Sequence, residues 1–229
     1  QSVAPSPTSR TMLAQARALS ALLDEMGQPL MVFNELGKRR GVGIGEYGAG
    51  ASINHHQQNP PKSVPVSKWH PEEWQAIVHE GNYATIKAAD YCWGLFLWNM
   101  FDFASVWRDE GDASGINDKG IVTYDRKTKK DVFYFYKANW SQEPVLYLTS
   151  RRHTERDEAV TPVKVYSNAS EVMLRVNGVV VGRTRVDDLK IARWNEVRLK
   201  SGENTIEVEA TIDGRKLTDS CVWTLRKTS

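Results

Sequence analysis

Hydrophobic and polar residues follow two different patterns along the chain, and the change falls near residue 144. Before this point, short apolar runs alternate with segments that have apolar residues at steps of three and four, as in amphipathic helices. After it, short runs rich in β-branched residues alternate with turn signals. The pattern predicts an α/β region over residues 1–143, followed by an all-β region over residues 144–229.

The first region is expected to contain helices and buried parallel strands in alternation. Helical spacing covers Thr8–Met26 and about 70–89, and the aromatic-rich segment Val132–Asn139 is typical of a packed helix. The apolar runs Val42–Gly45 and Trp93–Trp98 have the length of strands, and their nearly continuous apolar character is typical of a parallel sheet. Alternation of this kind indicates βα units.

The second region is expected to form an immunoglobulin-like sandwich. In the run from Ile206 to Ala210, apolar and acidic residues alternate, so one face of this strand would be buried. Asn177-Gly178 is a strong signal for a two-residue hairpin turn. The segments expected to be strands are Val145–Thr149, Pro162–Ser167, Glu171–Val176, Val179–Arg183, Asn195–Leu199, Thr205–Thr211 and Ser220–Arg226. Short strands at this density are typical of a β-sandwich.

The composition narrows the classes of protein to which the chain can belong. Hydrophobic residues make up 41% and charged residues 25% of the 229 residues, as in an ordinary globular protein. The 30 basic and 28 acidic side chains leave a net charge of +2, which argues against nucleic acid as the main partner. The most apolar stretch, Tyr91–Trp107, is shorter than a span of ~20 residues and contains Asn99 and Asp102, so no membrane partner is expected.

Four residues at or after the ends of the two predicted strands carry candidate chemistry. Glu46 lies where the first strand meets a Gly-rich turn, a position that faces the active site when the strand belongs to a parallel barrel. Trp98 ends the second strand, and its flat ring and N–H group suit the C–H face of a sugar. Asn117 and Lys119 lie two positions apart in a later loop, where both can point at one polar ligand. Taken singly, a solvated loop acid and a core tryptophan are the alternative interpretations.

The remaining polar clusters are expected to be solvated. His55-His56 is interpreted as a pair of loop histidines, because adjacent histidines point apart, and no metal site is expected. The acidic cluster Asp109–Asp112 and the charge run Asp125–Lys130 are expected to lie on the surface. Cys92 and Cys221 are expected to be free thiols.

Longer motifs in this order resemble glycoside hydrolase family 2, especially its β-galactosidase branch. The residues that carry the resemblance are Gly45-Glu46-Tyr47-Gly48-Ala49, Trp93-Gly-Leu-Phe-Leu-Trp-Asn-Met-Phe-Asp102 and Gly115-Ile-Asn-Asp-Lys-Gly-Ile-Val122, extended by Asp125-Arg126-Lys127 and Tyr134-Phe-Tyr-Lys-Ala-Asn-Trp140. The resemblance implies the last strands of a (β/α)₈ TIM barrel, over 1–143, and an immunoglobulin-like β-sandwich over 144–229.

The resemblance also implies a role for each candidate residue. Glu46, at the end of the seventh barrel strand, would be the nucleophile of a retaining glycosidase, and Trp98, at the end of the eighth, would be the platform under the sugar. Asn117 and Lys119 would lie in the substrate-facing loop. The implied partner is a carbohydrate, a β-linked galactoside or related hexoside, with no cofactor. Because the similar β-glucuronidases hold the sugar carboxylate with an Asn-x-Lys motif, a glucuronide stays open as the alternative.

One component that the resemblance requires is not found. A retaining enzyme needs a second carboxyl group about 5 Å from the nucleophile, as acid and then base, and the family places it in an Asn-Glu pair far upstream. Only 45 residues precede Glu46, and 143 residues are fewer than the ~200 of a closed barrel. Asn34-Glu35 is too close to Glu46 in sequence and is expected to be an exposed portion of a helix.

We therefore expect the C-terminal portion of a larger enzyme. The alternative is a non-catalytic carbohydrate-binding or structural fragment. The exposed strand edges of a partial barrel would need to be covered, and self-association into a homo-oligomer is one way to cover them.

Overall fold

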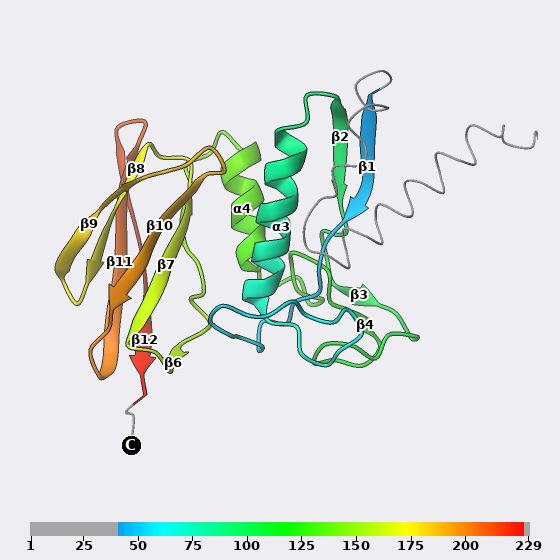
Figure 1. Cartoon of the computed structure of the whole chain (residues 1–229), viewed down its shortest axis with the longest axis horizontal. Coiled ribbons are helices and arrows are strands. Elements are labelled where there is room, and N and C mark those ends of the chain that lie inside the picture. Colours follow the sequence, from blue (N-terminus) through cyan, green and yellow to red (C-terminus); the bar gives the residue numbers. More distant parts are fainter. Residues whose placement is uncertain (1–40, 227–229) are drawn as a thin grey trace, which may run out of the picture.

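The computed structural model describes residues 41–226, where a pair of helices stands between a parallel strand pair and a β-sandwich (Figure 1). The helix expected at Thr8–Met26 and the pair Asn34-Glu35 lie outside the described residues. Within residues 41–226, no helix is both long enough and apolar enough to span a bilayer.

The α/β region begins with a strand–helix–strand unit. Strands β1 (Val42–Tyr47) and β2 (Cys92–Leu97) are parallel, and α3 (Glu72–Lys87) lies in the connection between them. Tyr47 pairs with Leu97, so both strands end at the same edge. The predictions of these two strands and of the helix are confirmed. In the α/β region, the described residues contain this one pair of parallel strands, and the partial barrel stays a prediction.

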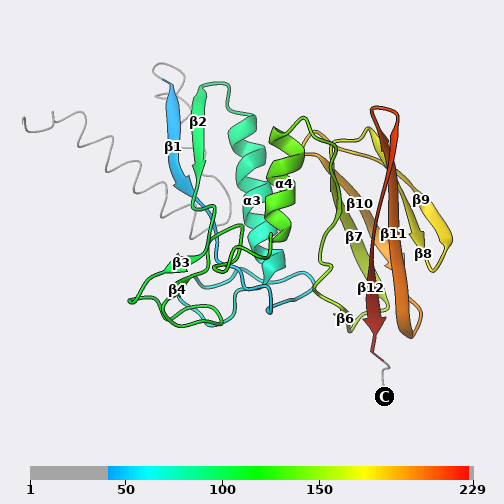
Figure 2. The ribbon, with the colours of Figure 1, turned by 180° about the vertical axis from the view of Figure 1, so that it is seen from behind.

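Helix α4 (Asp131–Trp140) packs beside α3, as both views of the ribbon show (Figures 1 and 2). The ring of Tyr83 on α3 meets the ring of Phe135 on α4 edge to face, with centroids 5.4 Å apart. Phe135 is fully buried. The aromatic residues that indicated a packed helix therefore form the contact between the two helices.

The loop between β2 and α4 contains a short antiparallel ribbon. It consists of β3 (Phe103–Ala104) and β4 (Ile116–Asn117), and Phe103 pairs with Asn117. Sequence analysis predicts only loop here, because strands of two residues carry no periodic signal. The ribbon matters because it brings the segment after β2 against the loop that contains Asn117.

Two antiparallel sheets form the C-terminal region of the structure. The three-stranded sheet has the order β10-β7-β5 and the five-stranded sheet the order β6-β12-β11-β8-β9. Their bounds are β5 Leu146–Leu148, β6 Glu155–Arg156, β7 Val160–Ser167, β8 Glu171–Val176, β9 Val179–Arg185, β10 Ile191–Arg198, β11 Gly202–Ile212 and β12 Arg215–Leu225. Each segment predicted to be a strand overlaps one, although β10, β11 and β12 begin several residues earlier than predicted; the two-residue β6, which pairs in parallel with β12, is the addition.

The apolar side chains of the sandwich meet between its two sheets. Val165 of β7, Leu174 of β8 and Ile206 of β11 are fully buried in this core, with Trp223 of β12 only 1% exposed. The alternation along β11 is confirmed, since its apolar positions point into this core. Two packed antiparallel sheets fit the immunoglobulin-like arrangement expected from the sequence.

The helices and the sandwich also share a core. Phe135 of α4 packs on Tyr166 of β7, with ring centroids 5.4 Å apart. Arg152 forms ion pairs with Glu72 at the start of α3 and with Asp131 at the start of α4, the second at 2.7 Å. The sandwich therefore fixes the start of both helices. The domain boundary at residue 144 stays a prediction.

Candidate active site

The segments that follow β1 and β2 are in direct backbone contact at the shared strand edge. The N–H of Trp98 donates to the carbonyl oxygen of Tyr47 at 2.9 Å. A Cβ at Gly48 would overlap the carbonyl oxygen of Trp98, so only glycine permits this approach. The peptide bond between Trp98 and Asn99 is cis. The Gly-rich turn after Glu46 is therefore packed against the residue that follows β2.

The loop with Asn117 and Lys119 lies along the same edge. The N–H of Asn99 donates to the carbonyl oxygen of Lys119 at 3.2 Å, and the N–H of Ile121 donates to the carbonyl oxygen of Asn99 at 3.0 Å. The three motifs that sequence analysis singles out thus meet in space, although up to about 70 positions separate them in the chain.

The buried side chain of Lys130 connects the segments that follow β1 and β2. Its Nζ donates to the carbonyl oxygens of Ala51, at 2.6 Å, and Asp118, at 2.9 Å, and to Oδ1 of Asp102 at 2.9 Å. Lys130 is fully buried and Asp102 is 6% exposed. Burial raises the pKa of Asp102 to about 6, although Lys130 lowers it. A single ammonium group therefore links the segment of Ala51, which follows β1, with the segments of Asp102 and Asp118, which follow β2.

The prediction of a solvated charge run is wrong at its end. Lys130, the last residue of the run, and Asp131, which follows it, are buried. Asp131 accepts hydrogen bonds from the hydroxyl group of Tyr147 at 2.8 Å and from the N–H of Ser150 at 2.6 Å. The reason is tertiary: both charges are satisfied by partners that a local pattern does not contain.

Glu46 is exposed and is the next-to-last residue of β1. Its neighbour Tyr47 is 3% exposed and packs towards α3, so alternation along the strand places the Glu46 carboxylate on the opposite face. The hydroxyl groups of Tyr47 and Tyr136 are hydrogen-bonded at 2.7 Å, and Nδ1 of His79 lies 2.9 Å from that of Tyr136. This buried network fixes the end of β1 and with it the position of Glu46.

Burial keeps the groups of this network uncharged. It lowers the pKa of His79 to about 3, with a smaller contribution from Lys130, and it raises the pKa of Tyr47. The strand end is therefore held by neutral hydrogen bonds, and the exposed carboxylate of Glu46 gains no counter-charge from them.

The other three candidates differ in accessibility. Trp98 is 39% exposed, and its ring meets that of Phe103 edge to face at 5.8 Å, so one portion of the indole faces solvent. Asn117 is only 2% exposed, and its Oδ1 accepts the N–H of Lys119 at 3.1 Å. Lys119 is half-buried and lines a small pocket together with Gly48 and His70.

A buried histidine–aspartate pair, which was not predicted from the sequence, includes Asp118 of this loop. Nδ1 of His70 lies 2.7 Å from Oδ2 of Asp118, and both side chains are buried. Burial lowers the pKa of His70, but the hydrogen bond and the charge of Asp118 outweigh it, so the pKa is raised overall. The two residues are 48 positions apart, so no local pattern could have indicated the pair.

The expectations for the acidic cluster and for the two cysteines have different outcomes. The acidic cluster is not wholly solvated, because Glu110 is 3% exposed and accepts two hydrogen bonds of 3.0 Å from Arg108. Residues 41–226 contain no group of three or more side chains that could hold a metal ion. The cysteines are free, as predicted.

The described residues supply one exposed carboxylate at the end of β1, and the nearby carboxylates of Asp102 and Asp118 are buried. In residues 41–226, no side chain forms a hydrogen bond or ion pair with Glu46, and no second carboxyl group contacts it. The geometry thus contains an exposed carboxylate, a partly exposed indole and a half-buried ammonium group.

Comparisons with known proteins find similarity to proteins named as β-glucuronidases and β-galactosidases. The chain is 48% identical over 180 residues to a β-glucuronidase of Bacteroides fragilis, which covers 78% of this chain and 26% of that protein. A crystal structure of a putative β-galactosidase from Bacteroides fragilis matches with a TM-score of 0.77 and 36% identity, over 84% of this chain and 29% of that one. The structure of an FMN-binding β-glucuronidase from Faecalibacterium prausnitzii L2-6 matches with a TM-score of 0.76 and 34% identity, over 93% and 30%.

Residues 158–218 match the model of a domain of unknown function, DUF4982. The chain spans about a quarter of the length of the curated relative named above. The ordered motifs, the fold and these relatives together define the class: the chain is similar to a part of longer proteins named as β-glucuronidases and β-galactosidases. The chain belongs to glycoside hydrolase family 2.

Proposed function

We propose that this chain forms the end of the catalytic region of a retaining β-glycosidase, with Glu46 as the nucleophile. The observation that carries the proposal is the exposed Glu46 carboxylate at a strand edge where backbone hydrogen bonds bring Trp98 and the loop of Lys119 together. In this proposal, β1 and β2 are the last two strands of a barrel within 1–143, and the sandwich occupies 144–229.

The reaction follows from the chemistry of an exposed carboxylate. An oxygen of Glu46 attacks the anomeric carbon, and the bond from this carbon to the leaving oxygen breaks, which gives a glycosyl ester on Glu46. Water then cleaves the ester and the configuration is retained. The acid that protonates the leaving oxygen, and later takes a proton from water, comes from outside the described residues. Trp98 supports the C–H face of the sugar.

For the substrate, we propose a β-glucuronide, and its carboxylate would pair with the Lys119 ammonium group. Two observations favour it: Lys119 borders the turn after Glu46, and the relative with 48% identity is named a β-glucuronidase. A β-galactoside, which the motifs first suggested, is the second candidate, and the putative β-galactosidase among the solved structures supports it. Asn117 holds the backbone of Lys119 in either case.

The same proposal accounts for an apolar surface on β2. Trp93 is 72% and Phe96 is 59% exposed. Further barrel strands would cover side chains of this kind, and in the 229-residue chain we expect a second copy to do so. Analytical ultracentrifugation should therefore show a dimer that dissociates in Trp93→Ser, and a monomer at all concentrations would contradict self-association through β2.

The catalytic assignment can be tested with a substrate that needs no acid. 2,4-Dinitrophenol leaves without protonation, and azide can replace water as an attacking group that needs no base. With 2,4-dinitrophenyl β-glucuronide and azide, the 229-residue chain should give β-glucuronosyl azide. Glu46→Gln should give none, while the matched control Glu203→Gln, an exposed glutamate on β11, should behave as the wild type. Unchanged product formation in Glu46→Gln would contradict the proposal.

A further inference from the structure

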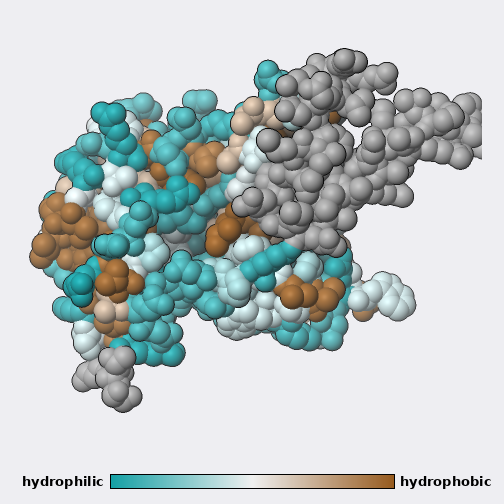
Figure 3. Space-filling view, in the orientation of Figure 1, coloured by the Kyte–Doolittle hydropathy of each residue, from teal (hydrophilic) through white to brown (hydrophobic). Residues whose placement is uncertain are grey.

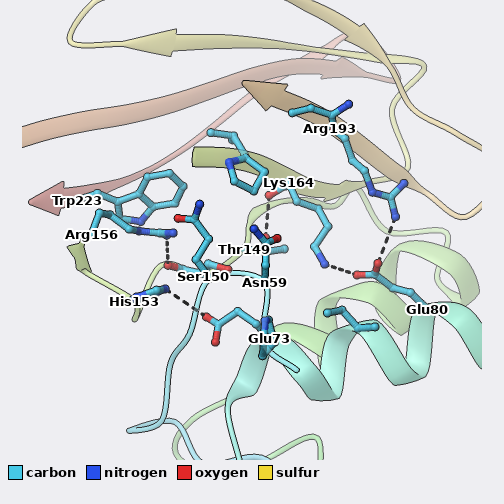
Figure 4. A pocket seen from close by; sticks show the side chains of 16 residues that line it. Asn59, Glu73, Glu80, Thr149, Ser150, His153, Arg156, Lys164, Arg193 and Trp223 are labelled. Atoms are coloured by element: carbon cyan, nitrogen blue, oxygen red, sulfur yellow. Dashed lines mark hydrogen bonds and ion pairs between the residues drawn. The ribbon is translucent and has the colours of Figure 1, made fainter. Parts of the chain in front are cut away.

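A pocket of about 230 Å³ lies between α3 and the sandwich, away from the candidate active site (Figure 4). Its walls come from residues 58–60, from α3, from the segment after β5 and from β6, β7, β10 and β12. None of its lining residues belongs to the turn after Glu46 or to the segments 98–122. Nothing in the proposed glycosidase reaction uses this pocket.

Arg156 is the unusual residue of the pocket. It is 3% exposed and is the only buried arginine in residues 41–226. Its guanidinium group lies 3.7 Å from the centroid of the Trp223 ring, Nη2 donates to the Ser150 carbonyl oxygen at 3.2 Å, and Nη1 contacts the Thr161 hydroxyl group at 3.4 Å. Nε has no hydrogen-bond partner among the described residues.

No carboxylate of the described residues lies within ion-pair distance of Arg156. A buried charge without a counter-charge is costly, because burial removes its hydration. Burial accordingly lowers the pKa of Arg156 to about 10, although the nearby charge of Glu73 raises it. The guanidinium group still carries its charge at neutral pH, and residues 41–226 give it no counter-charge in contact.

Two neighbouring side chains of the same pocket wall also have polar atoms without a hydrogen-bond partner among the described residues. Nε1 of Trp223 and Nδ1 of His153 are buried and form no hydrogen bond within residues 41–226. Figure 4 shows His153 beside Arg156 and turned towards Glu73, but Nδ1 and the Glu73 carboxylate are 4.0 Å apart, too far for a hydrogen bond. Burial and the nearby Arg156 lower the pKa of His153 to about 4, so its ring is neutral.

The opposite end of the pocket is also rich in cations. Nζ of Lys164 lies 2.5 Å from Oε1 of Glu80, and Nη2 of Arg193 lies 3.2 Å from Oε2 of the same carboxylate (Figure 4). Arg193 also pairs with Asp187 at 2.9 Å, so both cations at this end have carboxylate partners. Among the lining side chains, Arg156 is thus the one cation to which residues 41–226 give no carboxylate in contact, and an anionic ligand would supply one.

We propose that this pocket binds the oxyanion of a small molecule, a phosphate or a carboxylate group, through Arg156. An oxyanion is the counter-charge that a guanidinium group accepts in charge-assisted hydrogen bonds. The volume suits a compact ligand, since a water molecule occupies about 30 Å³ of liquid. The inference does not depend on the proposed glycosidase function.

The test is calorimetric titration of the 229-residue chain with inorganic phosphate, glucuronate and glucose at low ionic strength. Phosphate or glucuronate should bind and glucose should not, and the tighter of the two anions identifies the chemical source. Arg156→Met keeps an unbranched side chain of similar length beside Trp223 and should weaken binding at least about tenfold. Arg183→Met removes the same charge from an exposed ion pair on β9 and should leave binding unchanged.

Absence of binding by either anion would overturn the proposal, as would equal binding by Arg156→Met and wild type. If Arg156→Met does not fold, the wild-type protein still decides through the ¹⁵N spectrum of its arginine side chains. The slowly exchanging Nε–H signal of the buried arginine should shift on titration with the bound anion. A fixed signal during saturation would show that the anion binds elsewhere.

Discussion

Lys130→Met tests whether one buried ammonium group holds the strand-end segments in place. Methionine has a similar length, but it cannot donate the three hydrogen bonds to Ala51, Asp118 and Asp102. It also leaves the Asp102 carboxylate, which is 6% exposed, without its cation. Removal of one partner from a buried ion pair costs about 3 to 5 kcal/mol. We therefore expect the free energy of unfolding to fall by about that amount at pH 8.

The loss should depend on pH in a defined direction. The pKa of Asp102 is raised from 3.8 to about 6, with burial as the main cause and Lys130 opposing it. Without Lys130 the folded-state pKa rises further, so at low pH the folded variant holds a neutral carboxyl group. A group with a raised pKa favours the folded state below its unfolded value, and this contribution is lost as pH rises through the folded value. Lys130→Met should thus be less destabilising at pH 5 than at pH 8.

Urea unfolding of wild type, Lys130→Met, Asp102→Asn and the double variant at both pH values measures this effect. The double variant should lose less stability than the sum of the single changes, because no buried charge is left unpaired. A loss below about 1 kcal/mol in Lys130→Met at pH 8, or additive effects in the double variant, would refute the reasoning.

Three other predictions concern the same edge. Gly48→Ala should lower the melting temperature markedly, because the added Cβ would overlap the Trp98 carbonyl oxygen. The control Gly45→Ala should not, since its Cβ would meet no atom within 4 Å. Equal melting temperatures of the two variants would contradict the close approach of Gly48 to Trp98. Lys119→Ala should reduce kcat/KM for an aryl β-glucuronide far more than for the galactoside, and equal losses would favour the galactoside. The raised pKa of His70 predicts that protonated His70 stabilises the folded chain below pH 6.5 and that this stabilisation is lost as pH rises through the folded-state pKa. In urea unfolding, Asp118→Asn should not show this pH-dependent loss of stability.

Much of the fold follows from local patterns. Alternation along β11 and the hairpin turn at Asn177-Gly178 are properties of neighbouring residues, and both residues of that turn have positive φ, as the primed turns require. The ends of β1 and β2 could be located because each apolar run stops at polar or glycine residues. Sequence analysis could therefore place Glu46 and Trp98 at strand ends, and parallel pairing brings these ends to one edge.

The supporting polar residues could not be located in this way. Lys130 reads as the end of a solvated charge run, yet the carbonyl oxygen of Ala51, one of its partners, is 79 positions away. Burial of such a charge depends on acceptors that only the tertiary fold supplies. The same reason applies to Glu110, whose burial beside Arg108 contradicts the polar character of its loop. The unpaired state of Arg156 within residues 41–226 is not visible in the sequence either, because a missing counter-charge is a property of the packed structure.

Mass spectrometry of the chain after incubation with 2-deoxy-2-fluoro-β-glucuronosyl fluoride would show directly whether Glu46 is the nucleophile. Fluoride leaves without help from an acid, and the fluorine at carbon 2 slows hydrolysis of the glycosyl ester. The account predicts one added glycosyl unit on the peptide that contains Glu46, absent in Glu46→Gln and present in Glu203→Gln. An adduct on another carboxylate, or a wild-type chain that stays unlabelled, would contradict the role of Glu46.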